Sequence, residues 1–140
     1  MLGVDFGDVR IGIAVSDPTG TLCTPLETLQ ASGYEIDIRR IAEIAEKEEA
    51  VQIVVGLPIN MDGTHGPAAR RVQALCAKLR RASAVPVVAW DERLTSFEAE
   101  SRLRAGGIKP SRQRHRVDAA AAALILEGYL ASLSREREGI

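Results

Sequence analysis

The chain has 140 residues, of which 46% are hydrophobic and 26% charged, and its formal net charge is -1. This length and composition predict one globular domain, residues 1–140, with a hydrophobic core. The near-zero net charge argues against a nonspecific polybasic binder, and no apolar run reaches the length of a membrane span. Because the N-terminus is a core-like strand rather than a basic leader, we expect a cytoplasmic, unprocessed protein without a membrane partner.

The first predicted strand, Leu2 to Gly7, carries one carboxylate, Asp5, in an apolar run. Alternation places Gly3, Asp5 and Gly7 on one face of this strand. An aspartate in such a strand needs a hydrogen-bond partner, a bound cation or an open cleft, and flanking glycines leave room for something to approach it. A strand that ends early, with Asp5 starting a turn, is the plain alternative.

The next segments alternate between strand and helix patterns. Strands are predicted over 10–16 and 22–29, then a helix after Gly33, a strand over 51–56 that is apolar enough to be covered on both faces, and a helix that begins at Pro67. A last strand covers 85 to about 90, a capping box starts a helix near residue 95, and a final helix covers about 117–132. The order predicts an α/β fold: a mixed five-stranded sheet, three antiparallel strands and then two parallel ones, with helices on both faces.

Two further features concern side-chain chemistry. Cys23 and Cys76 lie in unrelated apolar contexts without metal-ligand spacing, which predicts two buried, reduced thiols. Residues 102–116 contain six Arg or Lys, His115 and no acid. We interpret this segment as a basic loop, opened by glycines 106 and 107 and Pro110. Its charge is equally consistent with a phosphate-binding patch and with a solvated surface loop.

Three carboxylates could meet at one edge of the predicted sheet. The active crevice of such sheets lies at the carboxyl ends of the parallel strands, so a last strand parallel to the first would bring Glu92 towards Asp5. Asp118 shares a helical face with Ala122 and should point toward the sheet, although taken alone it is more typical of a helix N-cap. Asp91 could replace Glu92, since neighbours at a strand end point to opposite faces.

Converging carboxylates repel one another unless a cation neutralises them. No lysine lies near any of the three in the sequence, and the clustered Cys and His of a zinc site are missing. Oxygen ligands suit hard divalent cations, Mg²⁺ or Mn²⁺. An oxygen-only metal site beside a basic segment indicates phosphodiester hydrolysis with two ions.

Four segments carry a resemblance to a known family, and they span nearly the whole chain in the right order. They read D-F-G-D-V-R-I-G-I-A-V-S-D, V-V-G-L-P-I-N-M-D-G-T, D-E-R-L-T-S and V-D-A-A-A-A-A-L-I-L-E-G-Y-L. Together they resemble the YqgF family, also called RuvX. The resemblance implies a ribonuclease H-like fold, kinship with Holliday-junction resolvases, and a nuclease of ribosome biogenesis that matures the 5′ end of pre-16S rRNA.

The resemblance also implies roles for particular residues. Asp5, Glu92 and Asp118 fall on the family's acidic positions, as catalytic residues and metal ligands, with Asp5 shared between two ions. The nucleic-acid contacts expected are Arg10, Arg93, Arg112, Arg114 and Arg116, although Arg93 could equally pair with an acid. Two departures stand out: Ala119, where a basic residue is common, and Glu127, where glutamine is usual.

The nature of the substrate stays open between RNA and DNA. A nuclease of structured RNA precursors is favoured, with a resolvase of branched DNA as the rival. A resolvase should be a stable dimer, whereas the sequence shows no strong dimer face, so we expect a monomer or weak homodimer. Aromatic residues make up only 4%, which argues against a platform that stacks many bases. A single-domain relative of actin-like nucleotide-binding proteins and a noncatalytic ribosome-assembly protein are the remaining alternatives.

Overall fold

The computed structural model describes residues 1–91 and 110–137, and within them the side chains of residues 1–91 and 119–133. The helix predicted to begin near residue 95 lies outside these residues. One five-stranded sheet forms the centre of the described part. Its strands are β1 (Leu2–Phe6), β2 (Arg10–Ser16), β3 (Cys23–Gln30), β4 (Ile53–Leu57) and β5 (Val87–Asp91).

The strand order in the sheet is β3-β2-β1-β4-β5. β1 pairs antiparallel with β2 and parallel with β4, and β5 pairs parallel with β4. The predicted mixed sheet is therefore confirmed. β5 runs parallel to β1, as predicted, with β4 between them, so the carboxyl ends of β1, β4 and β5 share one edge of the sheet.

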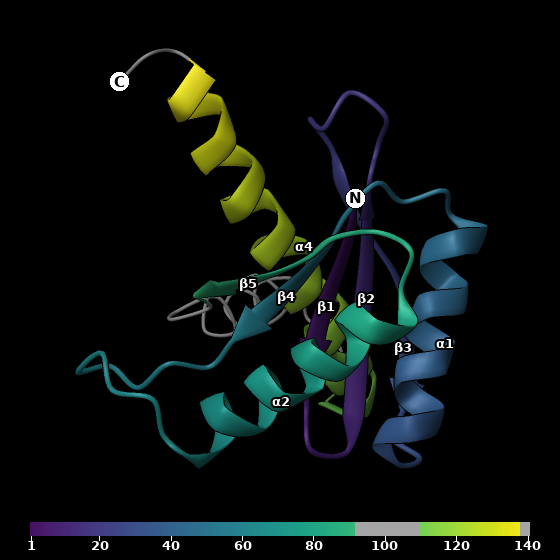
Figure 1. Ribbon diagram of the computed structural model, residues 1–140, viewed down its shortest axis with the longest axis vertical. Helices are drawn as coiled ribbons and strands as arrows, with labels where there is room; N and C mark the ends of the chain where they lie inside the picture. Colours follow the sequence, from purple (N-terminus) through teal and green to yellow (C-terminus); the bar gives the residue numbers. More distant parts are fainter. Residues whose placement is uncertain (92–109, 138–140) are drawn as a thin grey trace.

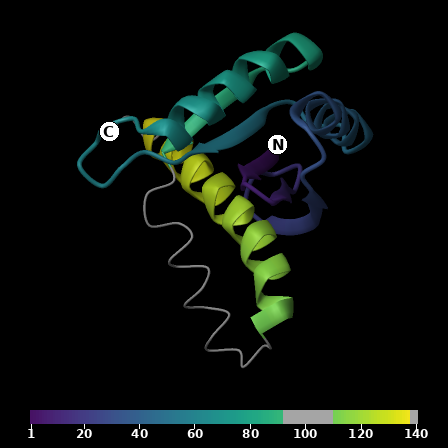
Figure 2. The ribbon, with the colours of Figure 1, turned by 90° about the horizontal axis from the view of Figure 1, so that it is seen from below.

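Helices cover both faces of this sheet (Figures 1 and 2). Helices α1 (Tyr34–Lys47) and α2 (Pro67–Ala82) lie on one face, and α4 (Pro110–Arg137) crosses the other. Alternation along the strands sends side chains into two cores. The larger core, under α1 and α2, includes Leu2, Val4, Phe6 and Ile53, and the smaller core, under α4, includes Ala14, Val54, Ala122 and Leu126.

Helix α4 begins earlier than the sequence predicted. It starts at Pro110, so the segment that carries Arg112, Arg114 and Arg116 is helical, and the interpretation of that segment as a loop was wrong. The physical reason is local. Proline is well placed in the first turn of a helix, and residues 111–127 include no glycine or second proline to break the helix.

Both cysteines lie in the interior of the protein. Cys23 and Cys76 are buried and free, as predicted. Burial raises the pKa of both thiols, that of Cys23 to about 11, with the negative charge of Glu127 as a second cause. In the described part of the chain, no helix combines the length and the hydropathy that crossing a membrane requires.

Candidate active site

Asp5 lies in β1 on the face of the sheet that α4 covers. Its neighbours Val4 and Phe6 belong to the core under α1 and α2, so Gly3, Asp5 and Gly7 occupy the opposite face. Asp5 is only partly buried, and the residue takes part in an interaction within the protein. The early-turn alternative is excluded, because β1 continues to Phe6 and pairs there with Ile11.

The positions around Asp5 in the sheet are glycines. Gly3 and Gly7 flank it along β1, and Gly12 is its partner in β2. In β4, the register that pairs Val4 with Val55 puts Gly56 beside Asp5 one residue further on. Within the sheet, none of these four positions places a side chain beside the Asp5 carboxylate; at Gly3 and Gly7 the corresponding space is taken by the carbonyl oxygens of Ala122 and Arg10.

Helix α4 packs on β1 through a close backbone contact at Gly3. A Cβ atom added to Gly3 would lie 2.7 Å from the carbonyl oxygen of Ala122 and 3.2 Å from Cβ of Leu126. Further along α4, the hydroxyl of Tyr129 donates to Oε1 of Gln52 at 3.2 Å, and Leu130 approaches Gly20. Since Gln52 and Gly20 lie at the amino end of β1, α4 runs antiparallel to this strand.

This direction decides which part of α4 lies near Asp5. Asp5 is two residues beyond Gly3 along β1, about 7 Å, and position 118 is one turn before Ala122 along α4, about 6 Å. Both steps lead from the Gly3–Ala122 contact towards the carboxyl end of β1. The topology thus brings the backbone of residue 118 to the end of the strand that carries Asp5.

The end of β5 is held against α4 by an aromatic pair. The rings of Trp90 and Tyr129 lie edge to face with centroids 5.7 Å apart, and Nε1 of Trp90 would lie 3.1 Å from a Cβ atom on Gly128. Trp90 pairs with Gly56, and Gly56 lies beside Asp5 in the sheet, so the three residues occupy the same face. Asp91 pairs with Leu57, which belongs to the core under α1 and α2, so Asp91 occupies the face of the sheet opposite Asp5. This position disfavours Asp91 as the acid that replaces Glu92.

The turn after β1 is tightly built. The backbone N–H of Gly7 donates to the carbonyl oxygen of Arg10 at 2.9 Å, and a Cβ atom on Gly7 would lie 2.5 Å from that oxygen. Across the turn, Nη2 of Arg71 in α2 lies 3.2 Å from Oδ1 of Asp8 and donates to the carbonyl oxygen of Phe6 at 3.4 Å. Asp8 and Arg71 therefore shape the turn that follows the Asp5 strand.

Arg10, the one predicted nucleic-acid contact whose side chain is described, lies at the start of β2. It is two residues from Gly12 and so occupies the face of Asp5, on a diagonal from it across the β1–β2 pair. The side chain is partly buried, and the residue takes part in an interaction within the protein. A guanidinium at this position contributes positive charge on the Asp5 side of the sheet.

The loop after β4 is held by its own side chains. Oδ1 of Asp62 accepts hydrogen bonds from N of Thr64 at 2.9 Å and from Oγ1 of Thr64 at 2.6 Å, which lowers the pKa of Asp62. Gly63 adopts φ 87°, a left-handed conformation that favours glycine, and its N–H donates to the carbonyl oxygen of Asn60 at 2.8 Å. Asp62 and Gly63 thus shape the backbone at the carboxyl edge of the sheet.

The other predicted site residues lie partly or wholly outside the described residues. Glu92 and Arg93 follow β5 directly but lie outside them, and for Asp118, Arg112, Arg114 and Arg116 the structure describes only the helical backbone. Among the side chains that are described, no three His, Cys, Asp or Glu gather as a metal site would require. The meeting of Asp5, Glu92 and Asp118 therefore stays a prediction.

Sequence reasoning missed part of the site. It gave Gly12 no role and assigned Gly56, with the long loop that follows it, to backbone shaping and substrate approach, whereas the register places both glycines beside Asp5. The sequence of β2 or of β4 taken alone does not show that these glycines lie beside Asp5, because cross-strand neighbours depend on how the strands pair. A glycine at the matching face position of each neighbouring strand is the signal that could have found them.

The arrangement defines the fold class: a ribonuclease H-like fold similar to that of RuvC. Two solved structures of RuvC from Thermus thermophilus share this fold, one alone (TM-score 0.55, 17% identity, 95% of each chain) and one with a Holliday junction (TM-score 0.57, 19% identity, 94% of each chain). Fowlpox virus resolvase shares it at a TM-score of 0.53 and 12% identity, over 95% of this chain and 99% of that one.

Sequence comparison then gives the family. Residues 1–132 match the model of the family described as "RuvX: Holliday junction resolvase". A protein of Anaeromyxobacter dehalogenans (strain 2CP-C), named "Putative pre-16S rRNA nuclease", is 51% identical over 129 residues, 92% of this chain and 94% of its own. One of Desulforudis audaxviator with the same name is 43% identical over 94% of each chain. The chain belongs to the RuvX family.

Proposed function

We propose that this protein is a divalent-metal-dependent nuclease that hydrolyses phosphodiester bonds in structured RNA, and that it matures the 5′ end of pre-16S rRNA. The observation that carries the proposal is the placement of Asp5. It is a carboxylate in the central parallel region of a ribonuclease H-like sheet, surrounded by glycine positions and approached by the backbone of residue 118. Relatives of about half identical sequence carry the pre-16S rRNA nuclease name.

The donors expected at this site fit Mg²⁺ or Mn²⁺. Asp5, Glu92 and Asp118 offer carboxylate oxygens, the ligands that hard cations prefer, and Gly12 and Gly56, which lie across the strands from Asp5, place no side chain beside it. Two bound ions would supply an activated water and a stabilised leaving oxygen. In our proposal Asp5 is the ligand shared by both ions, and the rigid β1–β2 pairing holds it in place.

Cationic side chains would hold the substrate phosphates. Arg10 lies on the Asp5 face, and Arg112, Arg114 and Arg116 belong to the first turns of α4, which continues over the same face of the sheet. Arg93 follows Glu92 in the sequence. Guanidinium groups suit this role, since they bind phosphate oxygens through two parallel hydrogen bonds.

A resolvase acting on branched DNA is the second candidate. The observation that favours it is the fold shared with RuvC bound to a Holliday junction, together with the description of the family. Symmetric cutting of a junction requires two sites held in a stable dimer. Dimerisation measured together with junction cleavage is therefore the signature of this alternative.

One experiment separates the candidates. Purified protein is incubated with precursor 16S RNA and with a four-way DNA junction, each with Mg²⁺, with Mn²⁺ and with EDTA. We expect RNA cleavage at the precursor end that depends on the metal, and little junction cleavage. Symmetric cutting of the junction alone would establish the DNA alternative, and undiminished RNA cleavage in EDTA would refute the metal-dependent mechanism.

A further inference from the structure

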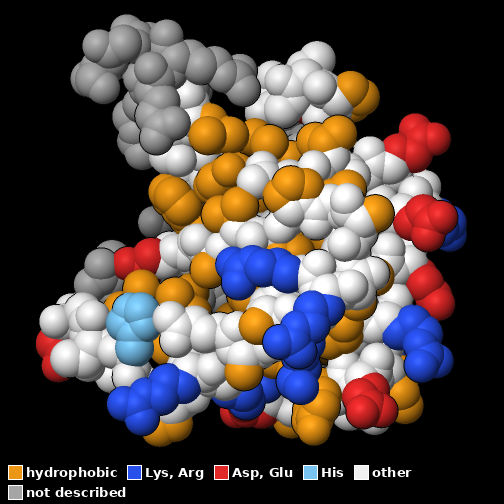
Figure 3. Space-filling view, viewed as in Figure 1, with side chains coloured by type: hydrophobic (Ala, Val, Ile, Leu, Met, Phe, Trp, Pro, Cys, Tyr) orange, Lys and Arg blue, Asp and Glu red, His pale blue; other side chains and the backbone are white. Residues whose placement is uncertain are grey.

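Helix α2 carries a cationic surface that the proposed active site does not use. Arg70, Arg71, Lys78, Arg80 and Arg81 are all exposed, and the chain from Thr64 to Trp90 contains no Asp or Glu. Figure 3 shows Lys and Arg side chains over α2 and the neighbouring part of α1, with Asp and Glu along the outer side of α1. Such an excess of positive charge on one surface of a chain of net charge -1 indicates an anionic partner.

A furrow between α1 and α2 begins at the turn that follows the Asp5 strand. Its first hollow, of about 290 Å³, is lined by Asp8 of that turn, by Tyr34 and Arg71, and by a second acid, Asp37, whose Oδ1 lies 3.8 Å from Nη1 of Arg40. A second hollow, of about 330 Å³, shares Tyr34 with the first and is lined by three cations, Arg39, Lys78 and Arg81, and one acid, Glu35. The furrow thus leads from the carboxyl edge of the sheet into a pocket with an excess of positive charge.

The three cations come from two helices and have no counter-charge in contact. None of Arg39, Lys78 and Arg81 makes an ion pair within 4.0 Å in the described part of the chain. Like charges brought to one hollow repel one another, and an anion placed between them would relieve that repulsion. Phosphate oxygens form charge-assisted hydrogen bonds with guanidinium and ammonium donors.

Tyr34 adds an aromatic surface at the junction of the two hollows. Nζ of Lys78 lies 4.7 Å from the centroid of its ring, and the residue is still 54% exposed. An exposed ring beside cations is the arrangement on which single-stranded nucleic acid stacks a base while its backbone is held electrostatically. One ring would bind one base, so this is no extended stacking platform.

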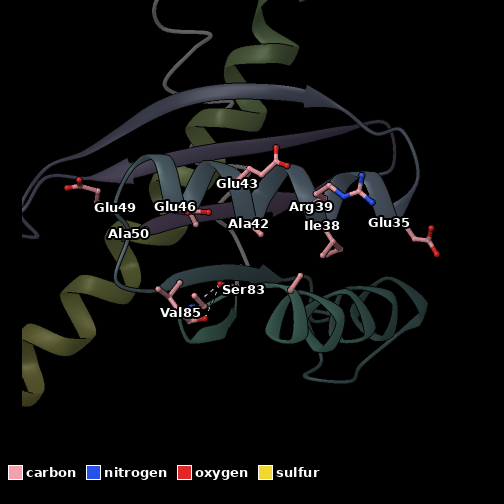
Figure 4. Close-up of a pocket in the computed structure, with 13 residues that line it drawn as sticks. Glu35, Ile38, Arg39, Ala42, Glu43, Glu46, Glu49, Ala50, Ser83 and Val85 are labelled. Atoms are coloured by element: carbon pink, nitrogen blue, oxygen red, sulfur yellow. Dashed lines mark hydrogen bonds between the residues drawn. The ribbon is translucent and has the colours of Figure 1, made fainter.

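The far end of the furrow has the opposite charge. The third hollow, about 690 Å³, shares Glu35, Ile38 and Arg39 with the second and continues along α1 past Glu43, Glu46 and Glu49. Figure 4 shows Ile38 and Ala42 on the side of α1 that faces Ser83 and Val85, with Glu35 near one end and Glu49 near the other. A phosphate backbone would be repelled there, so the cationic half sets the length of strand that binds.

From these observations we infer that the cationic half of the furrow, lined by Tyr34, Arg39, Arg71, Lys78 and Arg81, binds the single-stranded flank of the RNA substrate. The strand would pass from Asp5 round the Gly7–Asp8 turn and along α2. From Arg71 to Arg81 this helix offers about 15 Å of contact. The inference rests on the proposed function for the identity of the RNA, but the furrow itself lies on the opposite face of the sheet from Asp5.

The test compares two exposed lysines, one on each helix. Lys78→Gln removes a cation from the furrow, and Lys47→Gln removes one from the far end of α1. Affinity is measured without cleavage, in EDTA, for a short RNA that covers only the cut site and for a longer RNA with a single-stranded flank. We expect Lys78→Gln to weaken binding of the longer RNA several-fold and to leave the short RNA unchanged, while Lys47→Gln changes neither.

The salt dependence of RNA affinity distinguishes direct phosphate contacts from a purely structural role of the furrow cations, because only lost phosphate contacts change it. For a single strand, each phosphate that the protein no longer neutralises should reduce the slope of log affinity against log salt by about 0.7, so Arg39→Gln with Lys78→Gln should reduce it by about 1.4. Tyr34→Ala should weaken binding of the longer RNA roughly tenfold with an unchanged slope, because stacking releases no counterions.

The outcomes separate the two proposals. If wild-type protein cleaves RNA but Lys78→Gln and Lys47→Gln bind the longer RNA equally well, the furrow inference is wrong and the proposed function stands. If binding depends on Lys78 and Tyr34 but no metal supports cleavage, the furrow inference stands and the nuclease proposal is wrong. A loss of binding that is equal for both RNA lengths would also overturn the inference, because it would place Lys78 at the cut site.

Discussion

The carbonyl oxygen of Ala122 occupies the space in which a side chain on Gly3 would stand, since an added Cβ atom would lie only 2.7 Å from it. This contact is where α4 rests on β1, two residues before Asp5. The absence of a side chain at Gly3 therefore sets how closely the helix that carries Asp118 approaches the strand that carries Asp5.

Gly3→Ala should be destabilising, because either the helix or the strand must shift to admit the methyl group. We expect a loss of about 1–3 kcal/mol in the free energy of unfolding, measured by urea denaturation. At a low temperature, at which the variant is still folded, its nuclease activity should nevertheless be reduced. Gly66→Ala is the control: its Cβ would meet only the side chain of Asn60, which can move, so it should cost less than about 1 kcal/mol. Equal losses for the two variants would contradict this account.

Asp5→Asn should abolish metal-dependent cleavage without unfolding the protein. Loss of an outer-shell partner of a metal site costs roughly 10–100-fold, and loss of a shared ligand should cost more. Mn²⁺ should raise the Tm of the wild-type protein but not that of Asp5→Asn, since a ligand stabilises the state that binds it. Glu43→Gln, which removes an exposed carboxylate on the other face, serves as the control and should keep both properties. A normal Mn²⁺ shift in Asp5→Asn would show that Asp5 is not a ligand.

Tyr129 should stabilise the packing of α4 on the sheet through two separable contacts, one with Gln52 and one with Trp90 of β5. Tyr129→Phe removes the hydrogen bond to Gln52 and should cost about 0.5–1.5 kcal/mol. Tyr129→Leu also removes the edge-to-face contact with Trp90 and should cost about 0.5–1.5 kcal/mol more. Trp90 fluorescence should change in the second variant only. Because Trp90 is two residues before Glu92, activity should fall further in Tyr129→Leu than in Tyr129→Phe.

Cys23 should make the protein less stable at alkaline pH. Burial raises the folded-state pKa of this thiol from 9.0 to about 11, so above pH 9 the unfolded chain ionises while the folded chain does not. The free energy of unfolding should therefore fall from about pH 9 to pH 11, and Cys23→Ser should flatten this slope. Thiol reagents at pH 7 should modify Cys23 and Cys76 only in denaturant. Rapid labelling of the native protein would contradict the burial.

Elements set by local patterns were predictable, and those set by packing were not. Alternation in residues 2–7 was enough to predict the face of Asp5, because strand periodicity is local and one face is plainly apolar. The start of α4 at Pro110 was missed because the segment's glycines and charge were interpreted as those of a loop, although proline suits the first turn of a helix. The parallel direction of β5 followed from the order of strands and helices, which restricts the possible connections.

The sequence by itself determined the α/β architecture with helices on both faces, the strand that holds Asp5, the acidic candidates and the RuvX resemblance, because periodicity, breakers and motifs act over short stretches of chain. Only the tertiary structure decided that Gly12 and Gly56 lie beside Asp5, that Asp91 lies on the opposite face, and that Tyr34, Lys78 and Arg39 share a hollow with Arg81. These relationships join residues far apart in the chain, and strand register and helix packing, which depend on the whole core, set them.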